Sequence, residues 1–320
     1  MEWIKPGIKI DFVGKRFYFF LFSLGLIILS IISFFFPGPN WGIDFKGGTE
    51  LRLRFKEQVE IAKVRSLVES LNLGEVQIQQ FRAGLGGEEE QGVDFLIRVE
   101  ELKQTSQEEE VKADKLITSK FSEGFGSEAF TILEVNYVGP KVGKELRERG
   151  AKALLYSLVG ILFYVGFRFE FRYALGAVLA LFHDAIISAG FYNLLQREWS
   201  LAIIAGLLTI IGYSVNDTIV IFDRIRETVR RTKRGNLKEL INQSINQTLS
   251  RTLLTSLTTL MALVFLAVFG GGVIRDFSIL MIFGLIIGTY SSIYIASSLV
   301  LLIEDIRLRR KGEEPKKEKK

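Results

Sequence analysis

Six long apolar blocks limit what this sequence can fold into more than any other feature. An α-helix rises about 1.5 Å per residue, so about 20 apolar residues cross a hydrocarbon core of about 30 Å. The shortest block follows an amphipathic lead, Val142–Lys152, and 48% of all residues are hydrophobic. The pattern predicts a polytopic α-helical membrane protein with six transmembrane helices. The blocks are Phe17–Phe36, Ala153–Phe167, Tyr173–Leu195, Leu201–Phe222, Leu253–Phe269 and Phe277–Ile303.

Residues 37–150, between the first two blocks, alternate between strand and helix patterns instead. The order is strand, helix, two strands, helix, strand, which is the ferredoxin-like α+β arrangement. An acidic segment, Gly84–Gly92, forms the expected hairpin tip between the middle strands. The expected elements are Thr49–Phe55, Val59–Leu71, Val76–Phe81, Val93–Val99, Glu108–Phe121 and Ala129–Val138. With 16 Lys and Arg against 21 Asp and Glu, and no basic aromatic platform, this region is not expected to bind nucleic acid.

Composition excludes several kinds of chemistry. The chain has no cysteine and one histidine, which rules out disulfides, thiol catalysis and His-rich or Cys-based metal sites. Gly139–Glu145 resembles a phosphate-binding loop, but its spacing is one residue short and Glu145 stands where Ser or Thr is needed. We therefore expect no enzyme activity and no cofactor, and a transmembrane ion gradient is the available source of energy.

The distribution of basic residues predicts the orientation. Segments 1–16, 168–172, 223–251 and 304–320 contain 22 Lys and Arg, whereas the opposite short turns contain only Arg197 and Arg275. The positive-inside rule then places both termini in the cytoplasm and the ferredoxin-like region outside. No small-residue cleavage motif follows the first block, so it is expected to stay as an anchor. The expected division is 1–36, the N-terminus and first helix; 37–150, the extracytoplasmic domain; 151–305, helices two to six; and 306–320, a charged cytoplasmic tail.

Asp217 is the most unusual residue of the fourth block. It lies within Gly212–Thr218 at lipid depth, where a charge costs about 2.5–3.5 kcal/mol, so such residues usually face a bundle interior and mark ion pathways. Helical spacing predicts one inward stripe through Gly206, Thr209, Tyr213, Asp217 and Arg224. The alternative is a packing carboxylate that neighbouring hydroxyls satisfy.

Two further polar features lie within the apolar blocks. Arg251 is expected to open the fifth helix at a depth similar to that of Asp217. There the two side chains could pair as a proton-loaded switch. Alternatively, the Arg251 side chain could extend to the lipid headgroups. His183-Asp184 lies near the middle of the third block. The pair could relay protons, or it could be a hydrogen-bonded packing pair. The glycines of Gly284-x-x-x-Gly288, like the many hydroxyls of the last two blocks, are expected to serve helix packing.

Four stretches carry long motifs in a fixed order: Gly42–Thr49, Val138–Leu146, Gly212–Glu227 and Asn242–Thr259. These motifs resemble those of the SecF family, bacterial protein-export membrane subunits of the SecD/SecF group in the RND superfamily. The resemblance covers nearly all of residues 1–305.

The resemblance implies half of an RND-type transporter in a bacterial cytoplasmic (inner) membrane. It implies work beside SecD and with the SecYEG channel, using the proton motive force to promote late-stage preprotein export. A half-transporter needs a second chain, so Thr209, Tyr213 and Val220 are expected to face SecD. The proton-pathway residues that the matched positions imply are Asp217, Arg251, Asn216, Tyr213, His183 and Asp184.

Two other functions fit parts of the sequence. An RND-like half-transporter for small molecules would share the intramembrane Asp217, although the external region shows no large apolar pocket pattern. A purely structural membrane scaffold would need no such carboxylate. The residues leave the coupling ion open between H⁺ and Na⁺.

Overall fold

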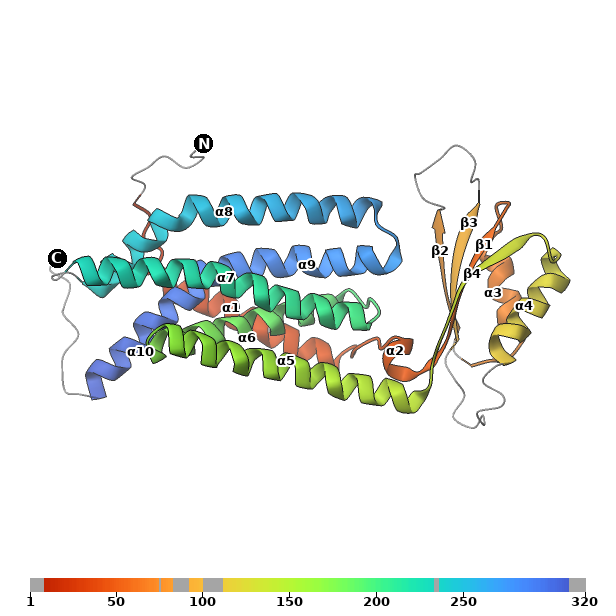
Figure 1. Cartoon of the computed structure of the whole chain (residues 1–320), viewed down its shortest axis with the longest axis horizontal. Coiled ribbons are helices and arrows are strands. Elements are labelled where there is room, and N and C mark those ends of the chain that lie inside the picture. The colour runs from red at the N-terminus through yellow and green to blue at the C-terminus, as the bar shows by residue number, and fades with distance from the viewer. Residues whose placement is uncertain (1–8, 75, 83–91, 100–111, 233–235, 311–320) are drawn as a thin grey trace.

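The structure is a computed structural model that describes residues 9–74, 76–82, 92–99, 112–232 and 236–310. A bundle of long helices forms one end of the elongated molecule, and a small α/β domain forms the other (Figure 1). The expected hairpin tip at Gly84–Gly92, apart from Gly92, the first residues of the Glu108–Phe121 helix and most of the tail at 306–320 lie outside the described residues.

The prediction of six membrane helices is confirmed within the described residues, since six helices are long and apolar enough to cross a bilayer. The last span is a continuous helical rod in which α9 passes through a π-helical turn, η1, into α10. The helices of the bundle are α1 (Arg16–Phe35), α5 (Pro140–Arg168), α6 (Phe171–Leu194), α7 (Leu201–Arg231), α8 (Leu237–Phe269), α9 (Gly272–Ser291), η1 (Ser292–Ala296) and α10 (Ser297–Arg310).

Three helices extend beyond their apolar blocks. The amphipathic lead and the second block are a single helix, α5, while α7 continues nine residues past Phe222 to Arg231. Helix α8 begins at Leu237, where the Asn236 side chain accepts a hydrogen bond from the Lys238 N–H at 3.2 Å and caps the helix. The expectation that Arg251 opens the fifth helix is therefore wrong. Hydropathy marks the part of a helix that lies in lipid, and polar residues continue the same helix outside it.

The α/β domain has the predicted ferredoxin-like topology. Its sheet has the order β2-β3-β1-β4 with antiparallel neighbours. In the register, Leu53 of β1 lies opposite Phe95 of β3 and Ile132 of β4. The elements are β1 (Gly48–Phe55), α3 (Ile61–Glu69), β2 (Val76–Arg82), β3 (Val93–Val99), α4 (Lys112–Phe125) and β4 (Phe130–Val138).

The two faces of this sheet differ in chemistry. Helices α3 and α4 cover the face that points away from the bundle (Figure 1), and the core there is apolar, with Leu53, Phe55 and Phe95 fully buried. Strand alternation therefore places the intervening charged residues on the face toward the bundle. Asp94 is buried on that face and pairs with the arginines of β1. Its other charged members are Glu50, Arg52, Arg54 and Arg98.

A four-residue helix, α2 (Ile43–Lys46), connects α1 to β1 and was not expected from the sequence. It packs against the start of α5, where a Cβ on Gly143 would lie 2.9 Å from the backbone of Phe45. Two of the sequence motifs that resemble the SecF family therefore meet at this contact. Glycine at position 143 lets the two backbones approach this closely.

Small residues set the packing distances inside the bundle, as the sequence predicted for Gly284 and Gly288. A Cβ on Gly284 would lie 2.2 Å from the Ile210 side chain of α7, so α9 and α7 touch closely at this point. Helices α1 and α6 meet in the same way at Gly190, where a Cβ would lie 2.2 Å from Ser30. Close backbone contact of this kind is how membrane helices associate without a hydrophobic driving force.

Candidate membrane-embedded polar site

A continuous series of hydrogen bonds crosses the bundle at His183 and Asp184 of α6. The Asp184 side chain is fully buried, with Oδ1 lying 2.8 Å from His183 Nδ1 and Oδ2 accepting a 2.5 Å hydrogen bond from the Ser214 hydroxyl of α7. On its other side, His183 Nε2 lies 3.0 Å from Ser23 Oγ of α1, which in turn lies 3.0 Å from the Tyr290 hydroxyl of α9. Four helices thus contribute to one polar series.

Every member of this series can exchange a proton with its neighbour. Hydroxyls both donate and accept, and the two imidazole nitrogens of His183 can be protonated in turn. The series joins the Tyr290 hydroxyl to Ser214 through Ser23, His183 and Asp184. Tyr290 also donates to the Phe19 carbonyl at 3.0 Å, which fixes the ring in place.

Asp217 lies on α7 one turn beyond Ser214 and starts a second polar group. The residue is 4% exposed, and its Oδ2 has no hydrogen-bond partner among the described residues. Ser256 of α8 presents its hydroxyl to the carboxylate and also lies 2.7 Å from Thr289 Oγ1 of α9. A buried carboxylate oxygen without a partner is costly, so this one requires a proton, water or a group from another chain.

Arg251 is the closest positive charge to Asp217, but the two side chains form no ion pair of 4.0 Å or less among the described residues. Arg251 is the fifteenth residue of α8 and its side chain is exposed on the outer surface of the bundle. Its charge therefore acts on Asp217 through space and not through direct contact.

The predicted inward stripe of α7 is only partly correct. Gly206 and Asp217 are buried, Tyr213 is half-buried with its hydroxyl 3.4 Å from Thr259 Oγ1, and Thr209 is exposed. Asn216 is exposed as well. The face of α7 that packs against α9 contains Gly206, Ile210 and Ser214, so it coincides with the predicted stripe only at Gly206. Asp217 thus lies at the edge between the packed and the free face of α7.

The exposed faces of α7 and α8 carry several polar side chains. We call this surface the polar strip. In a single chain it would contact lipid, where such groups are unfavourable. The polar strip consists of the exposed residues Thr209, Asn216, Arg251, Thr255 and Thr258.

Four buried hydroxyls of the bundle also have no hydrogen-bond partner among the described residues: those of Ser188, Thr218, Thr252 and Ser291. The π-helical turn η1 begins directly after the last residues of α9, and turns of this kind occur often at functional sites. No group of three or more His, Asp or Glu in the described part of the chain could hold a metal ion.

Sequence reasoning singled out Asp217, His183 and Asp184, which the structure buries, but missed the groups that form hydrogen bonds with His183 and Asp184. Ser23, Ser214 and Tyr290 complete the polar series, and none of them is unusual by itself in an apolar helix. One signal was available for Ser23, because α1 buries only serines, at positions 23, 30 and 33, and these lie on one helical face.

The fold and its polar core define a polytopic membrane protein with a ferredoxin-like domain after its first span and ionisable groups within the bilayer. Residues 101–305 match the family model described as "Protein export membrane protein SecD/SecF, C-terminal", and residues 32–59 match that described as "SecD/SecF GG Motif". The chain belongs to the SecF family of protein translocase subunits.

The relatives and solved structures agree along almost the whole chain. The chain is 46% identical over 312 residues to protein translocase subunit SecF of Magnetococcus marinus, covering 96% of each protein. It is 44% identical over 311 residues to the SecF subunit of Calditerrivibrio nitroreducens, covering 97% of this chain and 99% of the relative.

Two crystal structures of SecDF match at the level of the fold. One, in a super-membrane-facing form, is 38% identical with a TM-score of 0.70 and covers 98% of this chain. The other, described as a translocon-associated membrane protein from Thermus thermophilus, is 39% identical with a TM-score of 0.78 and covers 93% of this chain. The match spans 41% and 39% of those SecDF chains, so each contains much that has no counterpart here.

Proposed function

We propose that this chain is the SecF half of a proton-driven SecDF complex that promotes late-stage preprotein export. The single observation that carries the proposal is Asp217, a carboxylate at membrane depth with an unpartnered oxygen at the edge of an exposed polar strip. A group in this position can take up a proton from one side and release it to the other when its surroundings change.

The partner in this proposal is SecD, which covers the polar strip. Thr209, Asn216 and Arg251 are exposed at lipid depth in the single chain, and burying such groups against lipid is unfavourable. Transporters of this architecture form their sites at the interface between two related halves. The length of the SecDF chains beyond the matched part is consistent with a second half of that kind.

The proposed proton route uses the residues that the sequence singled out. Asp217 carries the proton, the Arg251 charge favours its release, and Asn216 and Tyr213 line the route beside them. The His183-Asp184 pair relays protons between the Tyr290 end of the polar series and Ser214, one turn from Asp217.

The orientation follows from the basic residues. Both termini lie in the cytoplasm of a bacterium and the chain spans its inner membrane, because the basic segments are on one side. The α/β domain, in the extracytoplasmic part 37–150, then faces the compartment into which the SecYEG channel delivers the preprotein. Residues 151–305 hold the proton route, and 306–320 form a cytoplasmic tail.

Replacing Asp217 by Asn tests the proton role, because the amide keeps the size of the side chain and loses its titration. In vesicles that contain the translocase and SecDF, the Asp217→Asn variant should lose gradient-stimulated export while export driven by the channel alone continues. Asp223→Asn is the matched control, since Asp223 is an exposed carboxylate on the same helix.

The same vesicles separate the alternative functions. A structural scaffold predicts unchanged gradient-dependent export in Asp217→Asn. A small-molecule half-transporter predicts proton uptake without any preprotein, and wild-type uptake that is independent of preprotein would overturn our proposal.

Crosslinking tests the partner. A cysteine at Thr209 should crosslink to SecD, and one at Phe163, an apolar side chain 74% exposed on α5, should not. Crosslinks mainly to a second copy of this chain would replace the SecDF assignment with a homodimer.

A further inference from the structure

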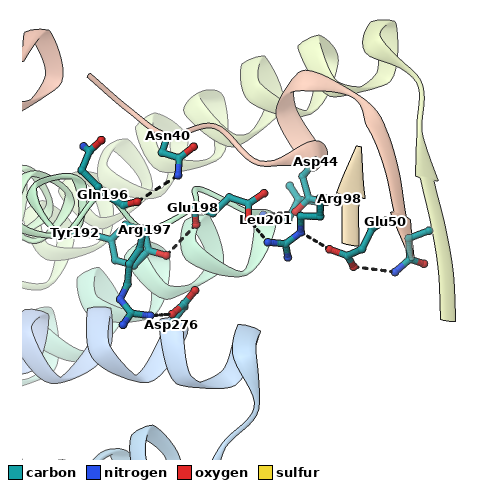
Figure 2. A network of polar contacts seen from close by, with 11 residues as sticks. Asn40, Asp44, Glu50, Arg98, Tyr192, Gln196, Arg197, Glu198, Leu201 and Asp276 are labelled. Carbon is teal, nitrogen blue, oxygen red and sulfur yellow. Dashed lines mark hydrogen bonds and ion pairs between the residues drawn. The ribbon is translucent and has the colours of Figure 1, made fainter. Parts of the chain in front are cut away.

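The α/β domain meets the helical bundle through a small set of polar contacts that the proton route does not use. Figure 2 shows Arg98 of β3 extending from the sheet toward the bundle, between Glu50 of β1 and Glu198 of the α6–α7 connection. Arg98 Nε donates to Glu50 Oε2 at 2.5 Å, and its Nη1 group pairs with Glu198 Oε2. We call Arg98, Glu50, Glu198 and the adjoining Asp44 the joint.

The joint is shielded from water. The Arg98, Glu50 and Glu198 side chains are 13%, 16% and 9% exposed. One guanidinium serves two carboxylates, so Arg98 links the Glu50 carboxylate of the sheet to the Glu198 carboxylate of the bundle. Burial raises the pKa of Glu198, and the charges of Glu50 and Asp44 act in the same direction, against the opposing effects of Arg98 and the Ile43 N–H.

The bundle side of the joint is held rigidly. The Glu198 carbonyl accepts a 2.9 Å hydrogen bond from the Tyr192 hydroxyl of α6, and the neighbouring Arg197 pairs with Asp276 of α9 (Figure 2). The loop that carries Glu198 is thereby fixed to two membrane helices.

The joint also holds the first turn of α7. Ser200, at the helix N-cap, makes no capping hydrogen bond with its own side chain, and Asp44 Oδ2 of α2 instead accepts from the Leu201 N–H at 2.8 Å. Helix α2 continues within two residues into β1 of the domain. The first turn of α7, the helix that carries Asp217, is therefore held by a side chain of α2, which leads directly into β1 of the sheet.

Backbone pairing strengthens this connection. The Gly42 N–H donates to the Trp199 carbonyl at 2.8 Å, and the Trp199 N–H donates to the Asn40 carbonyl at 2.8 Å. A Cβ at Gly42 would lie 2.6 Å from Glu198 Oε1, so glycine is needed for the Glu198 carboxylate to reach α2. The start of the Gly42–Thr49 stretch thus packs closely against Glu198.

A small hollow of about 20 Å³ lies beside the Arg98–Glu198 pair and is lined also by Trp41, Lys46 and Gln77. The side chains around the pair are therefore not fully close-packed on this side.

We propose that the joint transmits movement between α7 and the α/β domain, with Arg98 and Glu198 as positioning residues for gradient-driven export. A change at Asp217 shifts α7, the shift reaches its first turn at Leu201, and Asp44 and Glu198 pass it to the sheet. The inference rests on the proposed function, because it needs α7 to respond to the proton gradient. It adds the contacts through which a movement of α7 reaches the α/β domain outside the membrane.

Two reporters separate the steps in vesicles that contain the whole SecDF complex. The chain has no native cysteine, so a labelled cysteine at Val220 reports on α7, and one at Glu57, exposed after β1, reports on the domain. In the wild-type background both signals should change when a proton gradient is imposed. In Arg98→Gln the α7 signal should persist while the domain signal falls at least about ten-fold, because a broken buried ion pair is strongly disruptive.

Matched variants distinguish transmission from folding. Arg52→Gln removes another arginine from the same sheet face, whose partner Asp94 lies within the domain, and should keep both signals. Arg98→Lys should restore part of the domain signal, because it keeps the charge. If Arg98→Gln does not accumulate, Glu198→Gln replaces it, since this variant leaves the Arg98–Glu50 pair intact.

The outcomes are distinct. Persistence of both signals in Arg98→Gln and in Glu198→Gln overturns the role of the joint and leaves the proton role of Asp217 standing. Both signals are expected to be absent in Asp217→Asn. Their absence in the wild-type background overturns the proposed function and the joint's role with it.

Discussion

Replacing Asp217 should remove a voltage dependence whose size follows from the depth of this residue. A proton that binds Asp217 from the outer side crosses part of the membrane's electric field before it arrives. The carboxylate lies 16 residues beyond Leu201, the first residue of α7. At about 1.5 Å per residue this is about 24 Å, or about 0.8 of a hydrocarbon core of about 30 Å.

The energy follows directly. A unit charge that crosses 100 mV gains about 2.3 kcal/mol, so a proton at Asp217 gains about 1.8 kcal/mol. This corresponds to a change of about 20-fold in proton occupancy for each 100 mV. Export stimulation should therefore rise with potential as if about 0.8 of a charge moved.

Vesicles with a set potassium diffusion potential, and no pH difference, provide the assay. Preprotein import into inverted vesicles is measured at several potentials, for wild type, Asp217→Asn and the Asp223→Asn control. Wild type and control should show the steep dependence, and Asp217→Asn should show none. A wild-type dependence far below half a charge, or an unchanged dependence in Asp217→Asn, would refute the placement of the proton site at this depth.

Three other predictions concern stability and orientation. Burial raises the pKa of Asp94, but its bonds to the two arginines of β1 outweigh burial and hold the pKa below the ordinary 3.8. The ionised Asp94 therefore stabilises the folded domain fully at pH values above 3.8, and this contribution is lost as the pH falls through the lowered pKa. Asp94→Ala should thus destabilise the α/β domain by about 2–3 kcal/mol at neutral pH, measured by urea-dependent proteolysis, and the difference from wild type should shrink in strong acid. Gly190→Val should separate α1 from α6, reduce the stability by about 1–3 kcal/mol and lower the melting temperature of the purified complex. Gly25→Val is the control and should leave the melting temperature unchanged, because a Cβ at Gly25 meets nothing within 4 Å. A cysteine at Glu57 should react with an impermeant thiol reagent from outside and one at Thr232 only from inside, and the reverse pattern would contradict the orientation.

Much of the fold could be predicted because its signals are periodic. The strand at Val93–Val99 was predicted with both its ends, since its neighbours on the chain are charged or glycine-rich. The start of α8 at Leu237 was missed because the fifth block was bounded by continuous hydropathy alone, although Leu240, Ile241, Ile245 and Leu249 recur at helical spacing before Leu253 and are buried. The short helix α2 is too brief for any periodicity to appear, and its shape depends on contacts with α5 and Glu198.

In the candidate site, too, some features could be predicted from the sequence and others could not. A carboxylate in an apolar run is visible in the sequence, so Asp217 and Asp184 could be found there. The direction of a helix face depends on which neighbours pack closely, so the sequence could not show that Thr209 and Asn216 are exposed while Asp217 is buried. The ion pair of Arg98 with Glu198 joins residues 100 positions apart, and no local pattern connects them.

The serine face of α1 has a consequence for how the chain is made. Helix α1 packs against α6, which begins at Phe171, so about 135 residues must be synthesised before its partner exists. At about 5–20 residues per second, α1 waits in the bilayer for roughly 7–27 s. During this time its hydroxyls can be satisfied within the helix, as Ser33 is when it donates to the Ser30 carbonyl at 2.7 Å. A face built from serines, and not from charged residues, lets a newly inserted helix remain alone in lipid and still recognise its partner when it arrives.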